Sequence, residues 1–325
     1  MPPTTVRRLL RPIQIRTLMK QAQVAAWGEP PKCVDVPAPA APAAGHVQVK
    51  LLAAGLHNLV RARAAGLHYS AKTLPHIPGS DGVGTLDDGT LVYFSAMTPS
   101  GGSMAERINV PAAATTPLPA GADPIQVAGL ANPVMASWMA LATRTSHLPP
   151  AFTAVIVGAT TVSGTAAVSV LRAFGATRVV GIARPSERLA ALALDATIEL
   201  REDDAQTDYA PAADADVVLD FLYGAPTLHL LQSLKPTKPV QYVQIGTTAN
   251  KSLDLPGEIL RSKDITVRGS GPGAWQMSQF AEQSPKVIDA IATGRIAPLK
   301  FRIVKLDDVE HIWGEKGGER IVIVP

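Results

Sequence analysis

The hydrophobic pattern is strongest between residues 154 and 184, where two short apolar runs flank a turn of small residues and a helical pattern. Residues 155–157 are continuously apolar, which is typical of a strand buried on both faces. Apolar residues recur at helical spacing over 164–174, Gly175 stands where a helix would end, and 178–183 is a second apolar run. The pattern predicts one βαβ unit, the form that binds a dinucleotide with its pyrophosphate at the helix N-terminus.

The rest of the chain divides into two parts with different patterns. Before residue 125 the apolar runs are short and separated by turns, and Asp87-Asp88-Gly89 between two of them indicates a tight hairpin. After residue 125, strand and helix patterns alternate, which favours a parallel doubly wound sheet. The predicted fold class is therefore α/β, with a β-rich, barrel-like module followed by a parallel sheet.

The individual elements follow from the same runs. Strands are predicted over residues 23–27, 46–53, 82–86, 90–94, 104–110, 154–157, 178–183, 215–220, 240–245, 301–304 and 320–324. Helices are predicted over residues 133–145, 164–174, 185–194, 226–234 and 276–293.

The end of the second strand of the βαβ unit bears on the choice of cofactor. An acidic residue there would bind the ribose 2′-hydroxyl of NAD, and the sequence has Arg184 instead, which can pair bidentately with a 2′-phosphate. The turn lacks the full three-glycine fingerprint, because Gly158 and Gly164 frame it and Thr161 stands at the middle glycine position. The pattern predicts NADPH; a βαβ unit without a ligand is the alternative.

Composition limits the classes of protein. The chain of 325 residues is long enough for about two domains, and its 46% hydrophobic residues allow a sizeable core. A net charge of +3 with scattered Lys and Arg gives no stripe for nucleic acid. No apolar run reaches the roughly 18 residues that span a bilayer, so we expect a soluble protein without a membrane partner. The single Cys33 excludes an intrachain disulfide, which fits a reducing, cytoplasmic location.

Residues 1–18 form an N-terminal extension that differs from the rest. They include Arg7 and Arg16 and no acidic residue, a composition typical of a mitochondrial presequence. An unstructured segment or a wrongly assigned start is the alternative, because Met19 is followed at once by a strand-like run.

Six short segments occur in an order that resembles a known superfamily. They are AAGLHN at 53–58, IPGSDGVG at 77–84, GSMAE at 102–106, ANP at 131–133, the turn at 158–164 and ERIVI at 319–323. Together they resemble the medium-chain dehydrogenase/reductase superfamily, in its zinc-free quinone oxidoreductase and enoyl reductase branch. Over residues 19–325, this resemblance implies a GroES-like β-barrel domain and a Rossmann NADP-binding domain with the active site between them, and a homodimer. The implied boundaries are 19–125 with 274–325 for the barrel and 126–273 for the Rossmann domain.

The resemblance also bears on a metal. Zinc-dependent members hold a catalytic metal on Cys, His and Cys, and the matching positions here are His57, Ser80 and a non-ligand near Met135. A site built from His57, His68 and His76 would suit catalytic zinc, but nothing in their spacing brings them together. We therefore expect no metal.

Without a metal to polarise a carbonyl, hydride addition is easiest to an acceptor that carries its own electron sink. The resemblance thus implies NADPH-dependent reduction of a quinone or of an activated C=C bond in an enone or enoyl substrate. A metal-independent carbonyl reductase and a non-catalytic NADPH-binding or scaffold protein are the alternatives.

Three residues are candidates for catalysis. Tyr69 lies near the position of a tyrosine in related reductases, where it would donate a proton or bind an oxyanion, and His68 competes for that role. His57 and Asn58 match the position of the lost first metal ligand and are expected to face the nicotinamide or the substrate. Buried, hydrogen-bonded polar residues are the alternative.

The cofactor is expected to contact residues that match the superfamily or follow the predicted strands. Asn132 precedes Pro133 and is also a candidate helix N-cap. Each of the other candidates also has a structural alternative to cofactor binding. Ser163 and Ser186 would cap helices, and Leu222 and Tyr223 would pack in the core. Residues 269–273 would form a flexible crossover, and Arg320 would be exposed to solvent. The full predicted set is Asn132, Gly158, Thr160, Thr161, Val162, Ser163, Gly164, Arg184, Ser186, Leu222, Tyr223, Gly246, Thr247, Gly269, Gly271 and Arg320.

Overall fold

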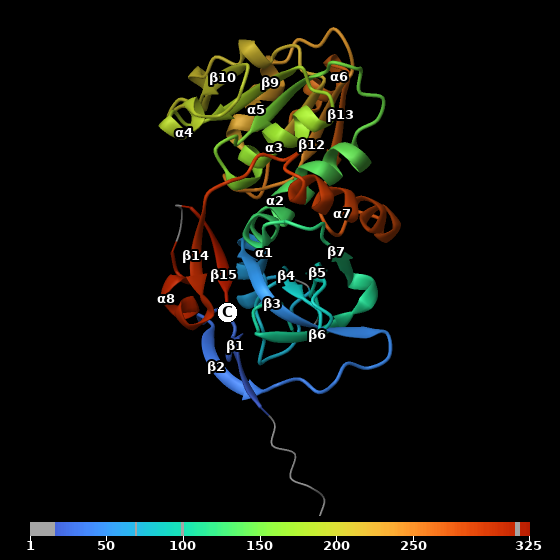
Figure 1. Cartoon of the computed structure of the whole chain (residues 1–325). Coiled ribbons are helices and arrows are strands. Elements are labelled where there is room, and N and C mark those ends of the chain that lie inside the picture. The colour runs from blue at the N-terminus through green and yellow to red at the C-terminus, as the bar shows by residue number, and fades with distance from the viewer. Residues whose placement is uncertain (1–16, 69, 99–100, 316–318) are drawn as a thin grey trace, which may run out of the picture.

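The computed structural model describes residues 17–68, 70–98, 101–315 and 319–325. Figure 1 shows two parts that each contain a sheet, with helices α2 (Pro124–Arg144) and α7 (Met277–Ala292) where the parts meet. The predicted fold class, α/β with a GroES-like barrel and a Rossmann sheet, is confirmed. The predicted domain boundaries stay predictions.

The Rossmann part contains a six-stranded sheet in the order β10-β9-β8-β11-β12-β13, and all of its strand pairs are parallel. Parallel strands end at one edge of a sheet, so the turns that follow them gather there, where such sheets bind ligands. The strands are β8 (Thr153–Val157), β9 (Arg178–Ala183), β10 (Ala196–Glu199), β11 (Val217–Asp220), β12 (Val240–Gln244) and β13 (Ile265–Gly269). The helices between them are α3 (Val162–Ala173), α4 (Glu187–Ala190), α5 (Ala225–Ser233) and α6 (Gly257–Ser262).

The barrel part contains a seven-stranded sheet in the order β14-β15-β3-β4-β5-β7, with β6 also paired to β3. Strand β15 lies antiparallel to β3, so the end of the chain joins the sheet built by its first third. The strands are β3 (His46–Leu56), β4 (Asp81–Thr85), β5 (Leu91–Ser95), β6 (Arg107–Pro111), β7 (Thr115–Pro117), β14 (Phe301–Lys305) and β15 (Arg320–Val324). A separate hairpin of β1 (Leu18–Gln23) and β2 (Lys32–Pro37) and the helices α1 (Asn58–Ala64) and α8 (Val309–Ile312) complete this part.

Asp123 is the N-cap of helix α2. The Asp123 carboxylate accepts a hydrogen bond from the backbone N–H of Ile125 at 2.8 Å, and Pro124 occupies the first helical position, where a missing N–H costs nothing. The predicted start at residue 133 is therefore wrong, and so is the prediction that Asn132 caps the helix. Pro133 lies inside α2, because burial of the helix on several sides outweighs the hydrogen bond that a proline removes.

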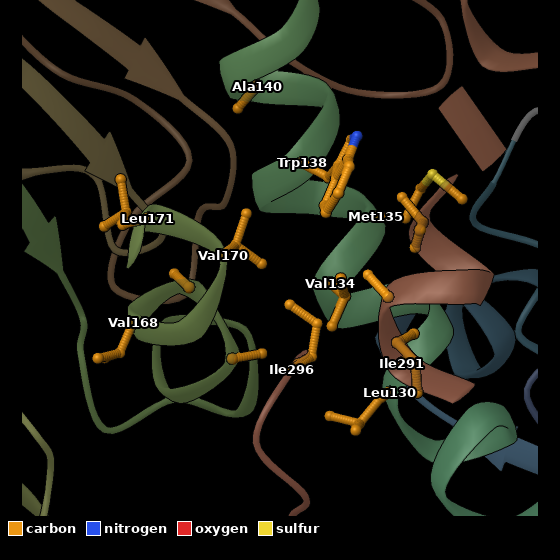
Figure 2. Close-up of a cluster of buried hydrophobic side chains, with 14 of the residues drawn as sticks. Leu130, Val134, Met135, Trp138, Ala140, Val168, Val170, Leu171, Ile291 and Ile296 are labelled. Carbon is orange, nitrogen blue, oxygen red and sulfur yellow. The ribbon is translucent and has the colours of Figure 1, made fainter. Parts of the chain in front are cut away.

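The core at the junction is shared by three helices. Figure 2 shows Leu130, Val134 and Trp138 of α2 in one cluster with side chains of α3 and with Ile291 of α7. Trp138 meets Phe174 edge to face, with ring centroids 4.9 Å apart. The same cluster includes Val83 and Val322 of the barrel sheet as well as Ile156 and Leu219 of the parallel sheet, so it joins the two parts.

Several other predicted bounds differ from the structure. The helix predicted over 185–194 is reduced to the four residues of α4, and the strand predicted over 23–27 lies earlier, at β1. The pattern missed β2 and α1. The hairpin at residues 87–89 is confirmed, since β4 and β5 pair in register across it.

The expectation of no membrane-length apolar segment needs a correction. Among the described residues, α2 is long and apolar enough to cross a membrane by length and composition. In this fold 72% of that apolar window is buried inside the protein, so the helix serves as a core element.

Candidate active site

A cavity of about 890 Å³ lies between the carboxyl edge of the parallel sheet and the barrel wall. The parallel-sheet side supplies the turn after β8, the ends of β11 and β12, and part of α2. The barrel side supplies the start of α1 and the segment before β15. The lining residues are Leu56, His57, Asn58, Leu59, Arg61, Ala65, Asn132, Ala136, Thr161, Val162, Ser163, Phe221, Ile245, Gly246, Thr247, Thr248, Trp313, Gly314, Glu315, Glu319, Arg320 and Ile321.

The turn after β8 is held by its own backbone and by Thr161. Gly158 has a φ of 89°, a conformation that favours glycine. The Thr161 hydroxyl donates to the Gly158 carbonyl at 2.8 Å and accepts from the Gly164 N–H at 3.0 Å, which makes Thr161 the N-cap of α3. A Cβ on Gly164 would lie 2.2 Å from the Gly158 carbonyl oxygen, so the helix can approach the strand this closely only without a side chain.

This capping corrects one alternative. Ser163 is inside the first turn of α3 and is not its cap. Since Thr161 occupies the Gly164 N–H, the N–H groups of Val162 and Ser163 remain at the helix start, where backbone donors have no intrahelical acceptor. Both residues line the cavity.

Two arginines follow β9. Arg184 is exposed directly after the strand. Arg188 follows in α4 and donates to the Thr160 carbonyl at 2.7 Å, so its guanidinium lies against the turn after β8. Ser186 caps α4 by accepting from the Leu189 N–H at 3.2 Å. The sequence pattern alone did not single out Arg188, although it follows Arg184 by only four residues.

The turn after β11 is organised by a buried carboxylate. Asp220 accepts hydrogen bonds from the backbone N–H groups of Leu222 and Tyr223 at 2.8 and 3.0 Å and from the Tyr242 hydroxyl at 2.7 Å. Gly246 after β12 lies against this turn. A Cβ on Gly246 would be only 2.6 Å from the Phe221 carbonyl oxygen. Asp220 therefore shapes the cavity rim without lining it.

At the barrel side, four polar residues form a buried network. His57 is the residue before α1, and its Nε2 lies 3.0 Å from the Ser80 hydroxyl. Ser80 donates to Asp81 Oδ1 at 2.5 Å, and the Tyr93 hydroxyl donates to Asp81 Oδ2 at 3.1 Å. All four side chains are buried, and only His57 lines the cavity.

The charges of this network are set by burial and by Arg320. Burial lowers the pKa of His57, with Arg320 acting in the same direction and Asp81 opposing both. Burial by itself would raise the pKa of Asp81, but its hydrogen bonds to His57 and Ser80 and the charge of Arg320 hold that pKa below its ordinary value. Burial lowers the pKa of Arg320 to about 10, so it stays charged at neutral pH. The solvent-exposed alternative for Arg320 is wrong, since its Nε and Nη2 are buried.

Arg63 holds the segment that carries Ser80 and Asp81. This arginine of α1 is fully buried and donates to the carbonyl oxygens of Gly79 at 2.8 Å and Thr98 at 2.6 Å. Helix α1 thus positions both sides of the contact between His57 and Ser80. His57 stands at the start of the helix, and Arg63 holds the segment of residues 79–81.

The structure brings nine of the predicted site residues into one cavity. They are His57, Asn58, Asn132, Thr161, Val162, Ser163, Gly246, Thr247 and Arg320. Gly158, Thr160, Gly164, Arg184, Ser186, Leu222, Tyr223, Gly269 and Gly271 do not line it, although the first three belong to the turn that does. Tyr69 lies outside the described residues. Within the described part of the chain, no group of three or more His, Cys, Asp or Glu side chains is placed to hold a metal ion.

A parallel dinucleotide-type sheet, a β-barrel and a cavity between them define an oxidoreductase of the dehydrogenase/reductase class. The chain is 32% identical over 357 residues to a protein named probable NADPH-dependent quinone reductase tdiC of Emericella nidulans, covering 94% of this chain and 100% of that protein. The chain belongs to the medium-chain dehydrogenase/reductase superfamily, in its quinone reductase branch. No family model matches it.

Solved structures share the fold at lower identity. AibC has a TM-score of 0.81 and 17% identity, with 99% of each chain covered. The quinone oxidoreductase of Pseudomonas syringae pv. tomato DC3000 has a TM-score of 0.72 and 21% identity, covering 94% of this chain and 100% of that one. An alcohol dehydrogenase from Pyrobaculum aerophilum has a TM-score of 0.76 and 23% identity, with 95% and 100% covered. At these identities the likeness establishes the fold.

Proposed function

We propose that the protein is an NADPH-dependent quinone reductase that works without a metal. The observation that carries this proposal is the single cavity that joins a phosphate-type turn, at Thr161 to Ser163, to a polar wall that contains His57 and Arg320. The name of the Emericella nidulans relative supports both the cofactor and the substrate class.

The turn after β8 fits a pyrophosphate. Gly164 leaves no side chain between helix and strand, and the N–H groups of Val162 and Ser163 point from the positive end of the α3 dipole. Arg184 and Arg188 are proposed to bind the 2′-phosphate, because Arg188 already lies against the turn and both are charged donors. Asn132, Gly246 and Thr247 are proposed to line the path toward the nicotinamide.

When bound, NADPH supplies the hydride. The residues of the chain have three remaining tasks: to orient the acceptor, to stabilise negative charge on its oxygen, and to provide one proton. Arg320 supplies positive charge at the polar wall, and exposed Asn58 at the cavity supplies an amide donor. His57 is the proton donor that the described part of the cavity offers. Tyr69 stays a candidate for the same role.

The test is NADPH oxidation by the purified protein with three acceptors: a quinone, an enone and a simple aldehyde. The proposal expects turnover with the quinone and none with the aldehyde, because a simple aldehyde has no conjugated system to spread the negative charge that hydride addition places on its oxygen. Turnover with the enone but not the quinone would move the assignment to an enoyl-type reductase. Turnover with the aldehyde would favour a carbonyl reductase, and no turnover with any acceptor would favour an NADPH-binding or scaffold role.

We also infer a homodimer. Strand β13 is an outer strand of the parallel sheet, and Val267 on it is 45% exposed, so a second copy can continue the sheet there. Light scattering of the eluted protein at twice the chain mass supports the dimer, and the mass of one chain contradicts it. A cytoplasmic location and the absence of nucleic-acid and membrane partners stay predictions.

A further inference from the structure

The hydrogen bonds of the buried network have a direction that fixes the state of His57. An ionised carboxylate only accepts hydrogen bonds, so at Asp81 Oδ1 the Ser80 hydroxyl must be the donor, at 2.5 Å. A hydroxyl has one hydrogen, and Ser80 has given it to Asp81. The remaining contact of Ser80, 3.0 Å to His57 Nε2, must therefore run from the imidazole N–H to the Ser80 oxygen.

The other ring nitrogen is thereby left with its lone pair. His57 Nδ1 is buried and has no hydrogen-bond partner among the described residues, and His57 is the member of the network that lines the cavity. Neutral imidazole carries one N–H, and it is on Nε2, so Nδ1 is the nitrogen available to a ligand.

We propose that Ser80 and Asp81 are positioning residues that hold the His57 proton on Nε2, so that Nδ1 is the atom that exchanges a proton with the acceptor oxygen. The inference deepens the proposed function and rests on it for the reaction. The overall reaction is quinone + NADPH + H⁺ → hydroquinone + NADP⁺. The hydride brings both electrons. The proton on Nδ1 of the His57 imidazolium passes to the substrate oxygen, so an N–H bond breaks and an O–H bond forms, and solvent later returns a proton to Nδ1.

In this scheme, Asp81 stabilises the protonated form of His57. While His57 carries two protons, the carboxylate stabilises the imidazolium directly, from 3.5 Å at Nε2, and through Ser80, and it leaves the second proton on Nδ1. Arg320 opposes that stabilisation, so the proton leaves readily when negative charge develops on the substrate.

Asp81→Asn reverses the direction of the hydrogen bonds that run from His57 through Ser80 to residue 81. An amide N–H directed at Ser80 makes Ser80 an acceptor there, its hydroxyl then donates to His57 Nε2, and the neutral ring carries its hydrogen on Nδ1. Tyr93→Phe is the matched control, because it removes the donor to the other Asp81 oxygen, Oδ2, and leaves the hydrogen bonds through Oδ1 intact. Ser137→Ala is the matched control for Ser80→Ala, since Ser137 is a buried serine of α2 outside the cavity lining.

The first readout is nitrogen-15 NMR of histidine-labelled full-length protein, with His57→Gln to assign the signal. We expect the hydrogen on Nε2 in the wild type and in Tyr93→Phe, and on Nδ1 in Asp81→Asn. A wild-type ring with its hydrogen on Nδ1, or no change in Asp81→Asn, overturns the positioning role. Circular dichroism confirms that each variant is folded, and Ser80→Ala gives a second break in the chain.

The second readout is steady-state reduction of a quinone. Asp81→Asn is expected to lower kcat by about 100-fold with KM nearly unchanged, the usual size of a lost general acid, while Ser137→Ala keeps wild-type kcat. An unchanged kcat in Asp81→Asn overturns the proton transfer through Nδ1. If the wild type reduces no quinone, the proposed function fails, and the proton transfer with it, whereas the NMR result decides the hydrogen-bond chain independently.

Discussion

The two ends of the cavity are built in different ways. The phosphate end is made by one short stretch, the turn from Gly158 to Gly164, whose backbone is held by the Thr161 hydroxyl. The polar end collects His57 from the start of α1, Asp81 from β4 and Arg320 from β15. The first end depends on local backbone geometry, and the second depends on side chains that the barrel topology brings together.

This difference separates binding from chemistry. A turn with free backbone donors recognises phosphate whatever the acceptor is, so it can serve many reactions. The polar end decides where a proton and a negative charge are placed, so it sets the reaction. Substitutions at the phosphate end should change cofactor affinity, and those at the polar end should change turnover.

The largest effect is expected from Gly164→Val at the phosphate end. Its side chain would meet the Gly158 carbonyl oxygen, which the backbone cannot avoid without moving the turn. We expect a loss of about 3 kcal/mol in the free energy of unfolding and no measurable NADPH binding. Urea unfolding and a fluorescence titration measure the two quantities. Ser169→Ala on the same helix is the control, and normal NADPH binding by Gly164→Val would contradict the assigned phosphate site.

A comparable loss of stability is expected when the pH is lowered, and its cause is His76. This histidine is fully buried, neither ring nitrogen has a partner within the described part of the chain, and burial lowers its pKa from 6.5 to about 4. A folded-state pKa below the unfolded value means that the stabilisation is complete above pH 6.5 and is lost as the pH falls toward 4. The loss amounts to about 3 kcal/mol.

The measurement is the free energy of unfolding of wild type and His76→Phe across this pH range. The wild type should lose more stability than the variant as the pH falls, by the stated amount. Exposed His311→Gln is the control and should follow the wild type. Parallel curves for the wild type and His76→Phe would show that His76 is not the group that titrates.

A smaller effect is expected from Arg188→Ala. One charge-assisted hydrogen bond to a phosphate contributes about 1.5 kcal/mol or more, so the Kd for NADPH should rise about tenfold while that for NADH stays unchanged. Isothermal titration with each cofactor measures both. An equal rise for NADH would place Arg188 at the turn alone, through its bond to the Thr160 carbonyl.

The smallest effect is expected from Asp123→Ala, outside both ends. It removes the N-cap of α2 and should cost about 1 kcal/mol of stability with no change in Kd for NADPH or in kcat. Thermal unfolding and the quinone assay measure these. A change in kcat would show that α2 transmits strain from its start to the cavity.

The sequence predicts the phosphate end well and the polar end only in part. Strand, glycine turn and helix are consecutive, so their periodicity identifies the βαβ unit, and Arg184 follows it directly. The partners of His57 are Ser80 and Asp81 at the start of β4, and no local pattern pairs Asp81 with Tyr93 of β5. Pro133 was misleading for a similar reason, because the burial that tolerates it inside α2 comes from helices far along the chain.

The central claim is that the cavity binds NADPH through its phosphate end. The most direct test is a fluorescence titration of the wild type and of Arg184→Asp with NADPH and with NADH. We predict that the wild type binds NADPH at least about tenfold more tightly than NADH, since the 2′-phosphate gains charge-assisted hydrogen bonds, and that Arg184→Asp removes this preference. Equal affinities in the wild type, or no binding of either cofactor, would contradict the account.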